Sequence, residues 1–111
     1  MWACYLGEIS DSYRENWEPH TVSPDQDEPD IFDVLARGQE IMYRLDWNAA
    51  KECFSDKIQV DWGGWAYKVT KAQALAYNER EGHSDRYGIP QSVIDEMEDG
   101  KTYAIIDVEM W

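Results

Sequence analysis

Alternation of apolar and polar residues predicts a strand at each end of the chain. Residues 2–9 are rich in aromatic side chains and alternate loosely, which is typical of a β-strand. Residues 102–110 alternate throughout, and side chains of successive strand residues point to opposite faces. One face is apolar, and we expect the other to be the outer one, exposing Asp107 and Glu109. The apolar face consists of Ala104, Ile106, Val108 and Met110, and the outer face of Tyr103, Ile105, Asp107 and Glu109.

A β-hairpin is predicted in the middle of the chain. Two β-prone runs, residues 57–62 and 65–70, flank a Gly-Gly pair at 63–64. Two-residue turns that match the strand twist need positive φ angles, which glycine adopts without strain. This turn would place Trp62 opposite Trp65. The two rings are then a cross-strand pair that stabilises the hairpin or, if either is exposed, an anchor for a protein partner.

Two helices are predicted before the hairpin. Asp30 can serve as an N-cap, and the residues after it place apolar side chains at helical spacing, so we expect a helix over 31–45. Gly38 interrupts it at a cost of roughly 1 kcal/mol relative to alanine. A second, shorter helix is expected over 49–54. The apolar positions of the first helix are Ile31, Val34, Leu35, Ile41, Met42 and Leu45.

Two more helices are predicted after the hairpin. Thr70 and Gln73 fit a capping box, so a helix should begin directly after Thr70. It should end just before Gly82, because glycine suits the left-handed position that follows a helix. Pro90 is suited to the first turn of the last helix, which we expect over 91–98.

These elements predict an α+β fold in a single domain covering residues 1–111. The order along the chain is β-α-α-β-β-α-α-β. We expect a four-stranded, mainly antiparallel sheet with the helices packed on one face. Residues 10–30 contain three prolines and no sustained apolar period, which predicts a long acidic loop.

The charge of the chain limits its partners. Twenty-three Asp and Glu residues against ten Lys and Arg give a formal net charge of -13 and a pI near 4.3. Such a field repels phosphates and anionic lipids and attracts basic protein surfaces. We therefore expect a basic protein partner, such as a nucleic-acid-binding complex. Direct contact with nucleic acid or with a membrane is not expected.

Hydropathy and the N-terminal residues predict a cytoplasmic location. Every apolar run is far shorter than the roughly 20 residues that span a bilayer. The N-terminal segment has neither the basic region nor the long apolar stretch of a secretory signal. Cys4 and Cys53 form either one disulfide or, as the cytosol favours, two reduced thiols on buried faces.

The acidic residues form two groups along the chain. The first surrounds the start of the predicted helix at 31–45, where carboxylates complement the helix dipole. The second lies at the end of the predicted helix at 91–98, where negative charge is unfavourable, and this points to binding rather than structure. The alternative is a solvated, solubilising face. The candidate partner-binding residues are Asp25, Asp27, Glu28, Asp30, Asp95, Glu96, Glu98, Asp99, Trp62 and Trp65.

Patterns for catalysis or metal binding are weak. The two histidines, His20 and His83, fall in loop-like segments, and the nucleophile motif G-x-S-x-G does not occur. The cysteines and histidines lack the spacing of a zinc site. A calcium loop starting at Asp25 would hold Asp30 and Ala36 where glycine and glutamate are required. We therefore expect a protein that is not an enzyme and uses neither a metal nor another cofactor.

Three functions remain, in this order. The first is a small acidic inhibitor or decoy, a DNA mimic that presents carboxylates to a basic nucleic-acid-binding surface. Anti-CRISPR and anti-restriction proteins of phages and mobile elements are of this general class. The second is an immunity-type or adaptor protein that binds a basic protein partner. The third is a small enzyme or metal-binding domain.

Overall fold

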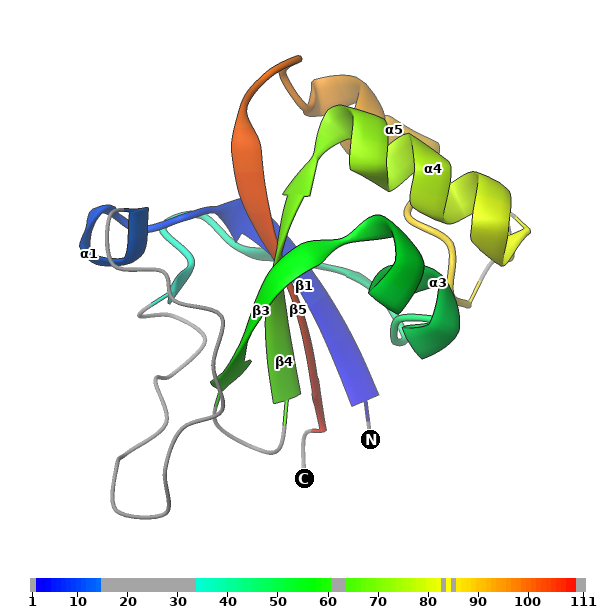
Figure 1. Cartoon of the computed structure of the whole chain (residues 1–111), viewed down its shortest axis with the longest axis horizontal. Coiled ribbons are helices and arrows are strands. Elements are labelled where there is room, and N and C mark those ends of the chain that lie inside the picture. Colours follow the sequence, from blue (N-terminus) through cyan, green and yellow to red (C-terminus); the bar gives the residue numbers. More distant parts are fainter. Residues whose placement is uncertain (1, 15–33, 61–63, 83, 85, 110–111) are drawn as a thin grey trace.

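The computed structural model of this chain describes residues 2–14, 34–60, 64–82, 84 and 86–109. They form one antiparallel sheet of five strands in the order β2-β1-β5-β4-β3, with helices packed against it (Figure 1). No helix in these ranges is long and apolar enough to cross a membrane. The elements are β1 (Trp2–Glu8), α1 (Asp11–Arg14), β2 (Gln39–Met42), α3 (Trp47–Cys53), β3 (Ser55–Val60), β4 (Gly64–Thr70), α4 (Lys71–Glu81), α5 (Gln91–Glu96) and β5 (Thr102–Glu109).

The α+β class with an antiparallel sheet is confirmed, but the count of four strands is wrong because β2 replaces part of the helix predicted over 31–45. β2 pairs antiparallel with the outer edge of β1. The apolar residues that matched one helical stripe in fact serve two faces of the sheet. Leu35 packs in the cluster on one face, whereas Met42 packs in the cluster on the other. Residues 31–33 lie outside the described ranges.

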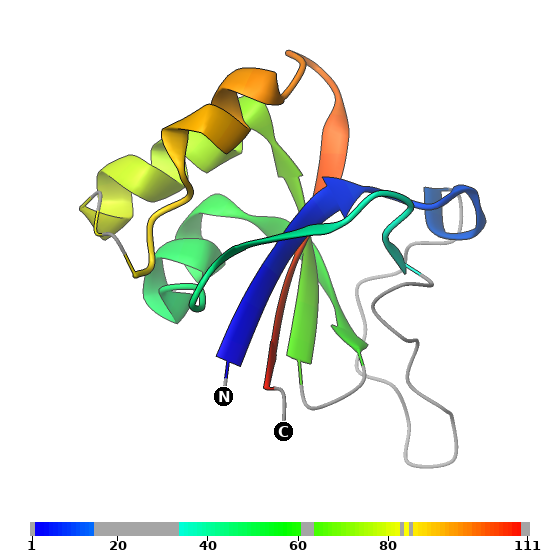
Figure 2. The same cartoon turned by 180° about the vertical axis from the view of Figure 1, so that it is seen from behind.

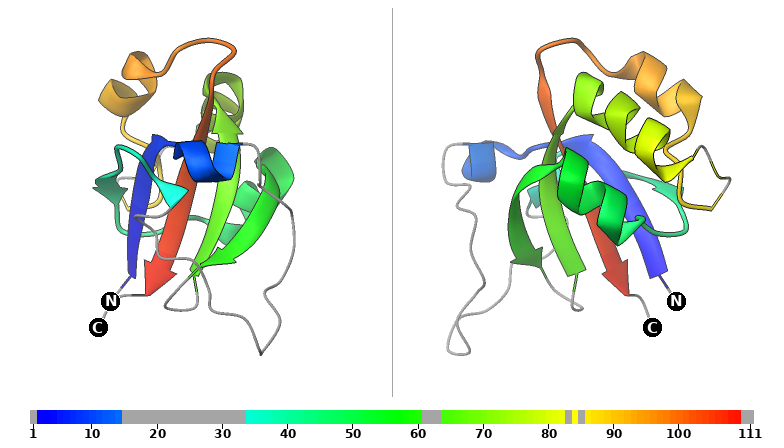
Figure 3. Two further views of the ribbon diagram at one scale, coloured as in Figure 1. Left: turned by 90° about the vertical axis from the view of Figure 1, so that its left-hand side faces the viewer. Right: turned by 45° about the vertical axis from the view of Figure 1, so that its right-hand side comes forward.

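Both faces of the central strand β5 are buried. Ile105 packs in the cluster beneath α3, α4 and α5, which lie together on one side of the sheet (Figures 2 and 3). Ile106 packs in the cluster on the opposite side. The predicted alternation is therefore correct, but the expectation of an exposed Asp107 is wrong, because helices cover that face and leave Asp107 only 2% exposed. The side chain of Glu109 is not among those described.

The hairpin of β3 and β4 is confirmed, but its predicted register is wrong. Trp65 is aligned with Gln59 rather than with Trp62. Gly64, which was expected in the turn, is aligned with Val60 of β3. Gly64 is the first residue of β4, and packing requires a glycine there, because a Cβ would overlap the main chain of β5.

The helices after the hairpin begin as predicted. At the start of α4, Thr70 and Gln73 form both hydrogen bonds of the capping box. The helix ends at Gly82, which adopts a left-handed conformation with φ of 97°. α5 is shorter than the predicted 91–98, because Met97 already has an extended backbone.

Two polar side chains of α4 hold neighbouring segments in place. Asn78 is 4% exposed and forms two hydrogen bonds of 2.8 Å with the main chain of Ile89, one as donor and one as acceptor. The hydroxyl of Tyr77 donates to the carbonyl oxygen of Tyr87 at 2.5 Å and accepts from the amide of Asp46 at 2.8 Å. One helix thereby positions the chain before α5 and the start of α3.

We predict that Asn78→Ala lowers the free energy of unfolding by about 3 kcal/mol, because a buried N–H and a buried carbonyl of Ile89 lose their partner. Urea denaturation measures the change. The control is Ala76→Gln, at an exposed position of the same helix, which should change the free energy by less than about 0.5 kcal/mol. Equal effects of the two substitutions would contradict the structural role of Asn78.

Candidate functional site

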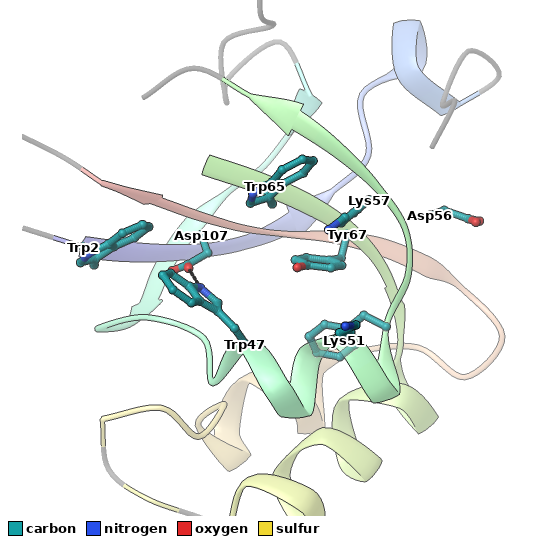
Figure 4. A pocket seen from close by; sticks show the side chains of 9 residues that line it. Trp2, Trp47, Lys51, Asp56, Lys57, Trp65, Tyr67 and Asp107 are labelled. Atoms are coloured by element: carbon teal, nitrogen blue, oxygen red, sulfur yellow. Dashed lines mark hydrogen bonds between the residues drawn. The ribbon is translucent and has the colours of Figure 1, made fainter. Parts of the chain in front are cut away.

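A pocket of about 470 Å³ opens between α3 and the strands β3, β4 and β5 (Figure 4). Its volume falls within the range of roughly 300–1,000 Å³ that is usual for small-molecule sites. Its lining combines five aromatic rings with two carboxylates and two lysines. These residues are Trp2, Trp47, Lys51, Phe54, Asp56, Lys57, Trp65, Tyr67 and Asp107.

Asp107 is the buried polar group of this pocket. It lies in the central strand, aligned with Trp65 of β4 and with Cys4 of β1. Its Oδ2 accepts a hydrogen bond of 2.6 Å from the indole Nε1 of Trp47, drawn as a dashed line in Figure 4, and its Oδ1 accepts one of 3.3 Å from the amide of Leu45. The carboxyl group therefore joins the sheet to the segment that leads into α3.

Burial raises the pKa of Asp107 from an ordinary 3.8 to about 6. The hydrogen bonds from Trp47 and Leu45 and the nearby guanidinium of Arg44 act in the opposite direction, because each favours the charged form. Removal from water is the larger effect. The carboxyl group is thus mostly ionised at neutral pH, in a site where its charge is poorly hydrated.

The aromatic side chains form the walls of the pocket. Trp2 and Trp47 meet edge to face, with their ring centroids 5.3 Å apart, and Phe54 lies 5.9 Å from Tyr67. Trp47 is 50% exposed, so part of this wall faces solvent. Aromatic rings present an electronegative face, which attracts cations and planar groups.

Two cations of the chain already use these rings. The ammonium nitrogen of Lys57 lies 4.4 Å from the ring centroid of Trp65. The guanidinium carbon of Arg44 lies 5.2 Å from the ring of Trp47 and 5.6 Å from that of Tyr87. The Nε of Arg44 is buried and has no hydrogen-bond partner among the described residues. Trp47 and Trp65 therefore each have a positive charge of the chain over the ring.

The second predicted group of carboxylates is well exposed. Asp95, Glu96, Glu98 and Asp99 all have exposed side chains at the end of α5 and in the turn that follows. Asp95 accepts a hydrogen bond of 2.9 Å from Gln91, and Glu98 lies 4.0 Å from the ammonium of Lys101. This acidic group lies just before β5 begins, whereas the pocket surrounds the residues at which β5 ends.

The other predicted site residues fall into two sets. Trp65 is half-buried and lines the pocket. The first acidic group and Trp62 lie outside the described ranges, as do His20, His83 and residues 15–30 of the predicted loop. The predicted site residues outside these ranges are Asp25, Asp27, Glu28, Asp30 and Trp62.

Asp107 and Trp47 are the site residues that sequence reasoning missed. Asp107 follows Tyr103 and Ile105 on the same strand face, and this was a usable signal, because a polar residue beside apolar ones often has a buried partner. Trp47 lies 60 positions before Asp107 in the chain, and only the folded structure brings them together.

Both cysteines are free thiols, Cys4 buried and Cys53 half-buried, so the disulfide alternative does not hold. Burial raises the pKa of each thiol, and raises that of Cys4 well above its usual value. A thiol in this state is a poor nucleophile at neutral pH. Among the described residues, no group of three His, Cys, Asp or Glu side chains could hold a metal ion.

Comparison with known proteins identifies no relative: no family model, no curated protein and no solved structure matches this chain. Its function must therefore be argued from its own residues.

We predict that Asp107 makes the protein less stable as the pH rises. Because its pKa is higher in the folded state than in the unfolded chain, protonation stabilises the fold, and this contribution is lost as the pH rises through about 6. Relative to Asp107→Asn, the free energy of unfolding of the native chain should fall by roughly 1–2 kcal/mol between about pH 5 and pH 8. Urea denaturation across this range measures it. A constant difference would contradict the prediction.

Proposed function

We propose that this chain is a small acidic binding protein of the cytoplasm, not an enzyme, which presents carboxylates to a basic protein surface. The partner that fits best is a nucleic-acid-binding protein. The chain would act as a DNA mimic and block the cationic groove of that protein. Inhibitors of the anti-CRISPR and anti-restriction kind belong to this class. The observation that carries the proposal is the exposed acidic group formed by Asp95, Glu96, Glu98 and Asp99.

Several cations of the chain have their main partners away from this acidic group. Arg80 pairs with Glu52 through two hydrogen bonds, of 2.6 and 3.1 Å. The ammonium of Lys101 binds Glu8 directly, and Glu98 lies at the 4.0 Å limit of an ion pair with it. Three further cations, Lys57, Arg44 and Arg86, lie over aromatic rings. Of these five cations, only Lys101 lies within ion-pair distance of the acidic group.

The position of these carboxylates is unfavourable for the fold itself. Asp95 and Glu96 occupy the last turn of α5, where the partial negative charge of the helix end disfavours carboxylates. Repulsion among four neighbouring acids adds to this cost. A cationic partner would relieve both effects, which gives the arrangement a physical reason in binding.

A second function, an immunity-type or adaptor protein, is favoured by exposed aromatic rings. Trp47 is 50% and Tyr43 37% exposed, and the guanidinium of Arg86 lies 4.5 Å from the ring of Tyr43. Trp, Tyr and Arg dominate the binding energy of many protein interfaces. A partner bound through these rings would be held by contacts that salt screens poorly.

The two functions are separated by neutralising the acidic group. In one variant, Asp95 and Asp99 become Asn and Glu96 and Glu98 become Gln. If the acidic group forms the interface, this variant should bind the partner captured from the host cytosol at least about tenfold more weakly, because several charge pairs are lost. Binding by the native chain should also weaken with salt and be competed by duplex DNA or RNA. Surface plasmon resonance measures all three effects.

The control variant has the same net charge but alters four exposed acids elsewhere. It carries Asp11→Asn, Glu40→Gln, Glu52→Gln and Glu79→Gln, all at exposed positions. Its affinity should remain within about threefold of the native value, since distant exposed charges are largely screened. Equal losses in the two variants would show that only net charge matters and would overturn the proposed interface. Salt-insensitive binding that nucleic acid does not compete would favour the immunity-type function.

A further inference from the structure

The structure contains a second site, the aromatic pocket around Asp107, at the opposite end of β5 from the acidic group. We propose that this pocket binds a guanidinium group, which stacks on the tryptophan rings and donates hydrogen bonds to the carboxylate of Asp107. The group comes from an arginine side chain of a protein or from a small guanidino compound. This inference is independent of the proposed function, because the two sites share no residue.

The carboxylate of Asp107 retains acceptor capacity for a bidentate donor. Its Oδ2 accepts a hydrogen bond from the indole of Trp47, and its Oδ1 accepts one from the amide of Leu45. A carboxylate offers about four acceptor positions, so both oxygens retain capacity. A guanidinium places two parallel N–H groups at the spacing of carboxylate oxygens, and this pairing is stronger than a neutral hydrogen bond.

The rings beside Asp107 suit a flat cation. Trp65 is aligned with Asp107 on the neighbouring strand, on the same face of the sheet, and Trp47 reaches the carboxylate from α3. Figure 4 shows both rings around Asp107, with Trp2 and Tyr67 beside them. Guanidinium stacks on aromatic faces through cation–π attraction, and it is more weakly hydrated than ammonium, so it enters such a pocket at a smaller desolvation cost.

Lys57 shows that the pocket accommodates a cation. Its ammonium lies over the ring of Trp65, 4.4 Å from the centroid, while it also lines the pocket. A tethered ammonium in this position competes with an incoming cation for the same ring. Lys57 therefore acts as an internal competitor, and its removal should strengthen binding.

The arrangement of charges favours a cation over an anion. The two lysines of the pocket, Lys51 and Lys57, both have exposed side chains, and Lys57 is directed at a ring. The buried charge of the pocket is the carboxylate of Asp107. An anion among the rings would lie close to this carboxylate. Repulsion between the two negative charges would be strong, because water screens a buried charge poorly.

The test uses two probes of the same shape. N-acetyl-arginine amide carries the guanidinium, and N-acetyl-citrulline amide replaces it with a neutral urea. Each is titrated into the full chain while the indole N–H signals of Trp47 and Trp65 are followed by NMR. The arginine probe should shift both signals saturably, and the citrulline probe should bind at least about tenfold more weakly, because the charged hydrogen bonds are lost. Equal binding of the two probes would overturn the proposal.

Three variants locate the bound group. Asp107→Asn should weaken binding of the arginine probe at least about tenfold. Lys57→Gln should strengthen it about threefold or more, because the internal competitor is gone. Lys71→Gln removes the same charge at the start of α4, outside the pocket, and should leave the affinity nearly unchanged. If Lys57→Gln weakens binding, or Lys71→Gln strengthens it equally, the proposal fails even where Asp107→Asn does not fold.

A last comparison identifies the source of the guanidinium. A Gly-Ser peptide with one central arginine is compared with methylguanidinium, which has no main chain. Tighter binding of the peptide, by about tenfold or more, indicates an arginine of a protein, whereas equal affinities indicate a free guanidino compound. Phenyl phosphate serves as the anionic probe, and if it displaces the arginine probe from the two tryptophans, the assignment of a cation site is overturned. Loss of the acidic group at α5 should leave all these affinities nearly unchanged.

Discussion

The carboxyl group of Asp107 is the contact that fixes α3 over the sheet. It lies in the central strand, and its two oxygens hold the indole of Trp47 and the amide of Leu45. These contacts set where the segment after β2 turns into α3, and α3 in turn forms one side of the pocket. Removing a carboxylate from water is costly, and the raised pKa of Asp107 reflects that cost. The hydrogen bonds from Trp47 and Leu45 and the nearby guanidinium of Arg44 offset part of this desolvation cost, because they stabilise the charged form.

Local signals in the sequence predicted the elements whose stability is local. The capping box between Thr70 and Gln73 located the start of α4, and Gly82 located its end, because both act within one turn of helix. The strands of the hairpin were also predicted from their composition. Their register was not, because Gly64 is required by close packing against β5 rather than by the turn.

Contacts between residues far apart in the chain determine β2, the burial of Asp107 and the pocket, and these features could not be predicted from the sequence. The residues around Met42 match a helical period as well as a strand, and only the open edge of β1 selects the strand. Asp107 was expected at the surface because helices over that face could not be located from spacing alone. The pocket joins residues from β1, α3, β3, β4 and β5. By contrast, the exposed acids at the end of α5 were found from sequence, because their unfavourable position relative to the helix is a local property.

The two proposals give the molecule two ways of binding positive charge. The exposed acids at the end of α5 would attract a partner through charge that salt screens, whereas Asp107 would bind its cation from a buried position, where screening is weaker. The account as a whole depends on Asp107 being a buried carboxylate that holds Trp47. The most direct measurement is an NMR titration of its carboxyl carbon together with the indole proton of Trp47. A shared midpoint near pH 6 is predicted, and an independent indole signal with a carboxyl midpoint close to the ordinary aspartate value of about 3.9 would contradict it.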